Sequence, residues 1–277
     1  MLYIPNIART LNYGQPVNRA SPLNRGLVSW WLNLPQRGKG NTFFDIAGAN
    51  HGTLTNGPTW QGSIGRPGGF GSLYQTGASA HVTAATQLSG ATAATWSFWM
   101  KTPVSSTEGW FCGNTAYNNS FFIGSSSSNR VQTYVSTELL ITSGSDFELN
   151  RWHHIAVTFI GSGARAIYVD GVSKAASSPS TIASIPSHTA VEFRGVTSTF
   201  LGTLEIDDVC IFNRALTAGE VRARYDESRQ GYPTTLNWYR RPVVDVPAAA
   251  GGGGTVIPAL DQGMFTGGLS TLGGGII

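Results

Sequence analysis

Short runs of β-forming residues, each long enough for only one strand, are the feature that most limits how this chain can fold. They alternate with clusters of Gly, Ser, Asn and Pro from residue 23 to residue 230, a pattern typical of a sandwich or a barrel. The chain has 277 residues, 35 of them glycine, and only 12% are charged, which disfavours a helical protein. Because single β-domains often reach about 200–250 residues, one all-β domain can account for this region.

Two segments give the clearest signals for strands. In residues 96–101, Trp96, Phe98 and Met100 alternate with side chains that include Ser97 and Lys101, so the strand has one apolar face. The Asp170-Gly171 pair lies between two further β-forming runs. Asp-Gly in this context is a strong signal for a two-residue hairpin turn.

Two adjacent histidines, His153 and His154, lie in a third strand that covers residues 151–159. Neighbouring strand residues point to opposite faces of a sheet, so the pair cannot hold one metal ion from this strand. We expect both rings to be structural, with ligand contact and catalysis as the alternatives.

One helix is predicted over about residues 217–229. Thr217 and Glu220 form a capping box, and Gly231 followed by Pro233 marks the end. The expected buried face carries Ala218, Val221 and Tyr225. The expected solvent face carries Arg222, Arg224, Glu227 and Arg229.

Charge, cysteines and the first residues restrict location and partners. The net charge is +3 with scattered Lys and Arg, whereas nucleic-acid binding favours a basic stripe, so we expect no nucleic-acid partner. Cys112 and Cys210 are expected to be buried strand thiols, with one disulfide as the alternative. The first residues lack the pattern of a signal peptide, and no apolar run is long enough to span a membrane. We therefore expect synthesis in the cytoplasm, without membrane insertion.

Three blocks, residues 26–60, 151–171 and 204–221, resemble the laminin-G-like, concanavalin-A-like lectin/glucanase superfamily in both content and order. The resemblance implies an antiparallel two-sheet jelly roll over residues 23–230, with the short helix near its end. It does not imply one activity, because a fold does not fix a function.

The glucanases of this superfamily carry a strand with Glu, Asp and a second Glu on one face. Here Glu205 and Asp207 match the start, but Val209 and Ile211 are expected next on that face. A retaining glycosidase needs two carboxyl groups about 5–5.5 Å apart. The sequence therefore predicts that the chain is not an enzyme.

A structural calcium is the one cofactor that the resemblance implies. The matching carboxylates are those of Asp45 and of Asp207 or Asp208. Calcium takes about six to eight oxygen ligands, and loop carbonyls and water would supply those that the carboxylates do not. In the alternative, Asp45 caps its own turn and the Asp pair binds neighbouring amides. Residues 73–82 lack the acidic run that many relatives carry.

A glycan surface is predicted from aromatic and amide side chains in a loop-rich region. Aromatic rings offer sugars a flat apolar platform, although Trp and Tyr are also common core residues. The candidate residues are Trp110, Tyr117, Asn118, Asn119 and Tyr134.

The chain ends predict arms, residues 1–22 and 231–277, on either side of the central domain. Residues 255–277 carry one charge but repeated apolar residues, unlike a typical disordered tail. Their backbone could add a strand to a partner's sheet. The residues expected to dock are Val256, Ile257, Leu260, Met264 and Phe265.

Taken together, these features favour a non-enzymatic structural protein of a larger assembly, such as a capsid decoration or fibre protein on a virion surface. Its arms would bind further copies or other capsid subunits, and its jelly roll would face outward. The alternative is a lectin module for cell-surface or extracellular glycans. A glycosidase ranks third.

Overall fold

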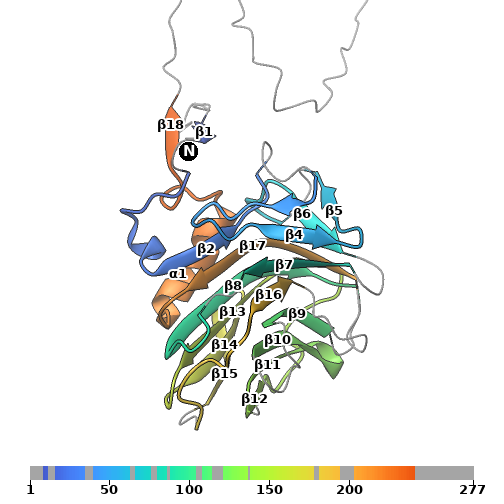
Figure 1. Ribbon diagram of the computed structural model, residues 1–277, viewed down its shortest axis with the longest axis vertical. Helices are drawn as coiled ribbons and strands as arrows, with labels where there is room; N and C mark the ends of the chain where they lie inside the picture. Colours follow the sequence, from blue (N-terminus) through green and yellow to red (C-terminus); the bar gives the residue numbers. More distant parts are fainter. Residues whose placement is uncertain are drawn as a thin grey trace, which may run out of the picture. The chain divides into compact units, whose positions relative to one another are not determined.

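A computed structural model describes the chain over residues 9–11, 16–34, 40–62, 66–75, 80–85, 88–103, 108–113, 121–136, 138–177, 181–193 and 203–240. Residues 9–239 form one compact unit. Two antiparallel sheets pack face to face in it (Figure 1), which confirms the predicted sandwich with one C-terminal helix. None of the described helices is long and apolar enough to cross a membrane.

The first sheet has the order β15-β14-β13-β8-β17-β6-β5, and β2 also pairs with β17. Its strands are β2 (Leu27–Trp31), β5 (Thr59–Gln61), β6 (Ser72–Gln75), β8 (Ala93–Lys101), β13 (His153–Ile160), β14 (Arg165–Val169), β15 (Val172–Ser177) and β17 (Leu204–Phe212).

The second sheet has the order β12-β11-β10-β9-β16-β7-β4-β3. Its strands are β3 (Thr42–Phe43), β4 (Gly52–Thr55), β7 (His81–Ala85), β9 (Glu108–Gly113), β10 (Phe121–Ser126), β11 (Arg130–Val135), β12 (Glu138–Ile141) and β16 (Ala190–Phe193). Two 3-10 turns, η1 (Pro22–Asn24) and η3 (Ser127–Asn129), and a two-stranded pair, β1 (Arg9–Leu11) with β18 (Trp238–Arg240), complete the described elements beside the helix.

The main core lies between the sheets and follows the predicted alternation. Trp96, Phe98 and Met100 of β8 point into it, with Ile155 and Val157 of β13. Burying such side chains contributes about 1.5–3 kcal/mol each relative to leaving them exposed. The predicted faces of both strands are therefore confirmed.

The helix α1 (Ala218–Arg229) begins at the predicted capping box of Thr217 and Glu220, and its buried face differs from the prediction. Arg224 and Glu227 are 1% and 7% exposed, whereas they were assigned to solvent. Ala218, assigned to the buried face, is exposed. The reason is that α1 packs on the outer face of the first sheet, which offers buried polar partners as well as apolar ones.

A second apolar cluster lies on that outer face, outside the main core. It joins Trp30, Cys210 and Phe212 of the sheet to Val221 of α1, and it includes Val17 and Leu236. Described residues on both sides of the predicted domain, residues 23–230, thus take part in this cluster, and the domain limits themselves stay a prediction. Cys210 and Cys112 are both buried and are not joined in a disulfide, which confirms the favoured prediction.

Candidate functional site

The two outer faces of the sandwich differ in what covers them. The outer face of the first sheet lies beneath α1 and the second apolar cluster. That cluster contains no residue from the strands of the second sheet. We call the outer face of the second sheet the open face because, within the described part of the chain, α1 and this cluster do not cover it. Its exposed or half-buried positions include Thr53, Thr83 and Tyr134, whereas Glu192, Cys112 and Phe122 at its centre are only 6%, 5% and 2% exposed.

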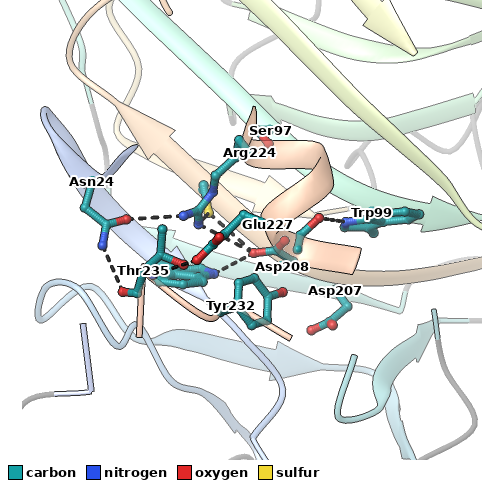
Figure 2. A network of polar contacts seen from close by, with 12 residues as sticks. Asn24, Ser97, Trp99, Asp207, Asp208, Arg224, Glu227, Tyr232 and Thr235 are labelled. Carbon is teal, nitrogen blue, oxygen red and sulfur yellow. Dashed lines mark hydrogen bonds and ion pairs between the residues drawn. The ribbon is translucent and has the colours of Figure 1, made fainter. Parts of the chain in front are cut away.

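A buried ionic network lies on the outer face of the first sheet, beneath α1 (Figure 2). The Arg66 guanidinium lies 2.8 Å from Asp207 and 3.8 Å from Asp208. Arg224 reaches Asp208 from α1 at 3.8 Å, and the Trp30 indole donates to the same carboxylate at 2.6 Å. Burial raises the pKa of Asp207 to about 6, although Arg66 opposes the shift.

The network extends to Asn24, which precedes β2, and to Thr235, which follows α1. Arg224 donates to Asn24 at 3.2 Å, and Asn24 donates to the Thr235 carbonyl at 2.9 Å. Glu227 accepts the backbone N–H of Thr235 at 2.7 Å. Because these groups are buried and bound to one another, we infer that the network holds α1 and its flanking segments on the sheet.

The adjacent histidines also have structural partners. The backbone N–H of Glu148 donates to Nε2 of His153 at 3.0 Å, so Nδ1 carries the proton and donates to Asp170 at 2.8 Å. His154 lies on the other face with Nε2 2.8 Å from the Ser97 hydroxyl. Burial lowers the pKa of His154 to about 3, so the ring is neutral near pH 7.

The strand with the glucanase-like start differs from prediction in one respect. Asp208 has a φ of 55°, and the pairing of β17 with β8 shifts between Asp207 and Cys210. This β-bulge adds a residue and reverses the alternation. Cys210 therefore shares the outer face with Asp207, and Val209 lies in the core, opposite to the predicted faces.

Neither outer carboxylate of β17 is arranged for glycoside hydrolysis. Glu205 lies 2.5 Å from the Lys101 ammonium and accepts the Ser72 hydroxyl at 2.9 Å. Asp207 is bound by Arg66. A retaining mechanism needs one carboxyl as acid and one as nucleophile on either side of the same sugar bond, and both groups here are held by cations within the fold.

The carboxylates proposed for calcium already have donors. Asp45 accepts backbone N–H groups of Trp30, Ala47 and Gly48 at 2.8–2.9 Å, the turn-capping alternative. Asp207 and Asp208 have arginine partners. These oxygens do not fit a calcium site, and no group of three His, Cys, Asp or Glu among the described residues could hold a metal. Calcium binding by this chain stays a prediction, without support from these carboxylates.

The predicted glycan residues fall in three different places. Trp110 is fully buried and packs edge-on against Phe98 and Phe147, which is the core role and leaves it no exposed surface for a sugar. Tyr134 is half-buried on the outer face of β11. Tyr117, Asn118 and Asn119 lie outside the described residues, as do the five predicted docking residues, Val256, Ile257, Leu260, Met264 and Phe265.

A continuous row of side chains crosses the open face of the second sheet. We call it the cross-sheet row, and its members are paired strand by strand: Thr42, Thr53, Thr83, Glu192, Cys112, Phe122, Tyr134 and Leu139. Their strand neighbours, such as Phe43, Leu54, Val82 and Val191, point into the core. Figure 1 shows the strands that carry it, from β4 and β7 through β16 to β12.

The two halves of the cross-sheet row differ in chemistry. Three threonines and Glu192 form the polar half, and Thr53 is exposed. Phe122 and Tyr134 form an edge-to-face pair in the other half, with ring centroids 6.2 Å apart. Phe122 is only 2% exposed, so this face offers hydrogen-bonding groups at one end and the half-buried Tyr134 ring at the other.

Sequence reasoning found only Tyr134 of this row. Glu192 lies between Val191 and Phe193, and Thr83 lies between Val82 and Ala84, so the period of two was readable in both strands. What the sequence did not contain is the register that brings β7, β16 and β9 side by side.

A sequence model described as the concanavalin A-like lectin/glucanases superfamily matches residues 76–222, just over half of the chain. No curated protein sequence gives a match.

Solved structures with a similar fold include toxin binding domains. The botulinum neurotoxin serotype D binding domain has a TM-score of 0.57 at 15% identity, covering 73% of this chain and 51% of that one. The binding domain of Paraclostridial Mosquitocidal Protein 1 has a TM-score of 0.59 at 17% identity, covering 74% and 53%.

A third structure is the botulinum neurotoxin serotype D ligand binding domain in complex with N-acetylneuraminic acid, with a TM-score of 0.57 at 15% identity. It covers 73% of this chain and 51% of that one. The chain thus spans about half the length of these structures, and at this identity the similarity concerns the fold.

Proposed function

Because the chain belongs to the concanavalin A-like lectin/glucanases superfamily, we propose that it is a glycan-binding domain whose binding surface is the open face of the second sheet. The observation that carries the proposal is the cross-sheet row, in which hydroxyl, carboxyl and aromatic side chains line up across eight strands. The proposal includes no catalytic step.

The chemistry of the row suits a sugar. Pyranose rings have apolar C–H faces and a rim of hydroxyls. An aromatic ring can stack on the apolar face of the sugar. Threonine hydroxyls can both donate and accept hydrogen bonds. Tyr134 would supply the platform beside Phe122, and Thr53 and Thr83 would bind hydroxyls toward the other edge.

The similar structures support binding rather than turnover. They are binding domains of toxins, and one is in complex with N-acetylneuraminic acid. That ligand belongs to the neurotoxin domain. For this chain the similarity favours a recognition role, and the choice of surface rests on its own residues.

The assembly hypothesis stays a prediction. It depends on the terminal arms, whose predicted docking residues lie outside the described part of the chain. Location on a virion and partnership with capsid subunits belong to the same hypothesis. The open face gives the glycan-binding alternative a concrete surface, and we therefore prefer it.

The proposal is tested by applying the intact protein to a glycan array and titrating the strongest ligands in solution. Tyr134→Ala should weaken binding about tenfold or more, a loss of about 1.4 kcal/mol. The matched control is Tyr74→Ala, because Tyr74 is also half-buried on a strand but lies on the first sheet. Absence of any glycan binding, or equal losses in both variants, would contradict the proposal.

A further inference from the structure

Glu192 is the one acidic member of the cross-sheet row, and it lies at the centre of the second sheet. It is paired with Thr83 on one side and with Cys112 on the other. Its side chain is only 6% exposed. Its Oε2 atom is buried without a hydrogen-bond partner.

An acceptor buried in this way is costly unless something donates to it, since buried polar groups are nearly always satisfied. Burial raises the pKa of Glu192, and the nearby His81 opposes the shift only in part. The carboxyl group therefore lies in this face with one oxygen that accepts no hydrogen bond, and Thr83 of the same row is paired beside it.

Few cations share this face. Among the described outward-facing side chains of the second sheet, the basic ones are His81 on β7 and Arg130 at the start of β11. Arg130 already donates to the Ser127 carbonyl at 3.2 Å. An acidic sugar placed beside Glu192 would thus meet a negative charge, and no member of the cross-sheet row carries a positive charge that could neutralise its own.

We propose that Glu192 accepts a hydrogen bond from a ligand hydroxyl and selects uncharged glycans over acidic ones. This inference rests on the proposed function and specifies its ligand class. A hydroxyl that donates to a carboxylate makes a charge-assisted bond. The same carboxylate repels a sialic acid or a uronic acid, and such repulsion is an established route to specificity. The preference is thus opposite to that expected from the sugar acid in the neurotoxin complex.

The test compares the wild-type chain with Glu192→Gln, using one oligosaccharide with and without its terminal sialic acid. Glutamine keeps the size and one acceptor but removes the charge. The wild type should bind the asialo form more tightly. The variant should lose about fivefold toward the asialo form, since a neutral acceptor makes a weaker bond, and should gain about fivefold toward the sialylated form.

The matched control is Glu205→Gln, because Glu205 is an outward-facing carboxylate on the first sheet and should leave both affinities unchanged. If Glu192→Gln does not fold, as judged by circular dichroism, Thr83→Val replaces it. That variant removes a hydroxyl from the residue opposite Glu192 and should weaken asialo binding.

Each outcome decides between the two proposals. Binding that depends on Tyr134 but ignores Glu192 and Thr83, or that favours the sialylated form in the wild type, overturns the inference and keeps the proposed function. Failure to bind either form, together with a blank array, overturns both. The predicted exchange of preference in Glu192→Gln supports both.

Discussion

At the level of single residues, the adjacent histidines show what a strand pattern can and cannot reveal. Their opposite orientations follow from the period of two and are confirmed. Their partners were not readable. Asp170, predicted only as a turn residue, has a φ of 52° and also accepts hydrogen bonds from His153 and from the backbone of His154. These contacts depend on how the hairpin folds back, which spacing alone does not specify.

His154 should make the fold sensitive to acid. Its pKa is about 3 in the folded state against 6.5 for the free group, so the unfolded chain binds an extra proton between these values. The stability that neutral His154 contributes is therefore fully present above about pH 6.5 and is lost as the pH falls toward 3. Because of this residue, the free energy of unfolding should be about 3 kcal/mol lower at pH 4 than at pH 7.

The measurement is urea unfolding at pH 7 and pH 4 for the wild type and His154→Gln. The variant should lose about 3 kcal/mol less on acidification than the wild type. Comparing the two chains cancels the opposite contribution of Asp207, whose raised pKa favours the folded state at low pH. Equal acid losses in both chains would refute the assignment.

At the level of elements, the features that depend on neighbouring residues were predicted correctly, and those that depend on long-range packing were not. The Asp-Gly hairpin and the capping box of α1 depend on neighbouring residues, and both are present. The buried face of α1 was misassigned because charged residues usually face solvent. Arg224 is an exception, since the bulge at Asp208 places a carboxylate beneath the helix.

Arg224 should be needed to hold α1 on the sheet. Arg224→Met should destabilise the fold by about 3–5 kcal/mol, because it removes one partner of a buried ion pair. The control is Arg222→Met, which breaks the exposed pair with Asp226 and should cost less than about 0.5 kcal/mol. Chemical denaturation measures both.

A second variant separates the ion pair from simple loss of packing. In Arg224→Met combined with Asp208→Asn, the carboxylate charge is also removed, and asparagine tolerates the positive φ of that position. The double variant should recover part of the lost stability. If it is as unstable as the sum of both single changes, the pairing account of Arg224 is wrong.

At the level of the whole molecule, the sandwich was predictable because many short amphipathic strands can bury their apolar faces only against one another. The position of the open face could not be predicted, since it depends on which sheet α1 and the segments that flank the jelly roll cover. Strand register was equally hidden, and it alone brings Thr83, Glu192 and Tyr134 into one row.

The central claim is that a glycan binds across the open face of the second sheet. The most direct test is to map amide chemical shifts of the intact, isotope-labelled protein while the strongest array ligand is added. The account predicts the largest changes along β7, β16, β10 and β11, around Thr83, Glu192 and Tyr134. Changes confined to α1 and the first sheet would contradict it.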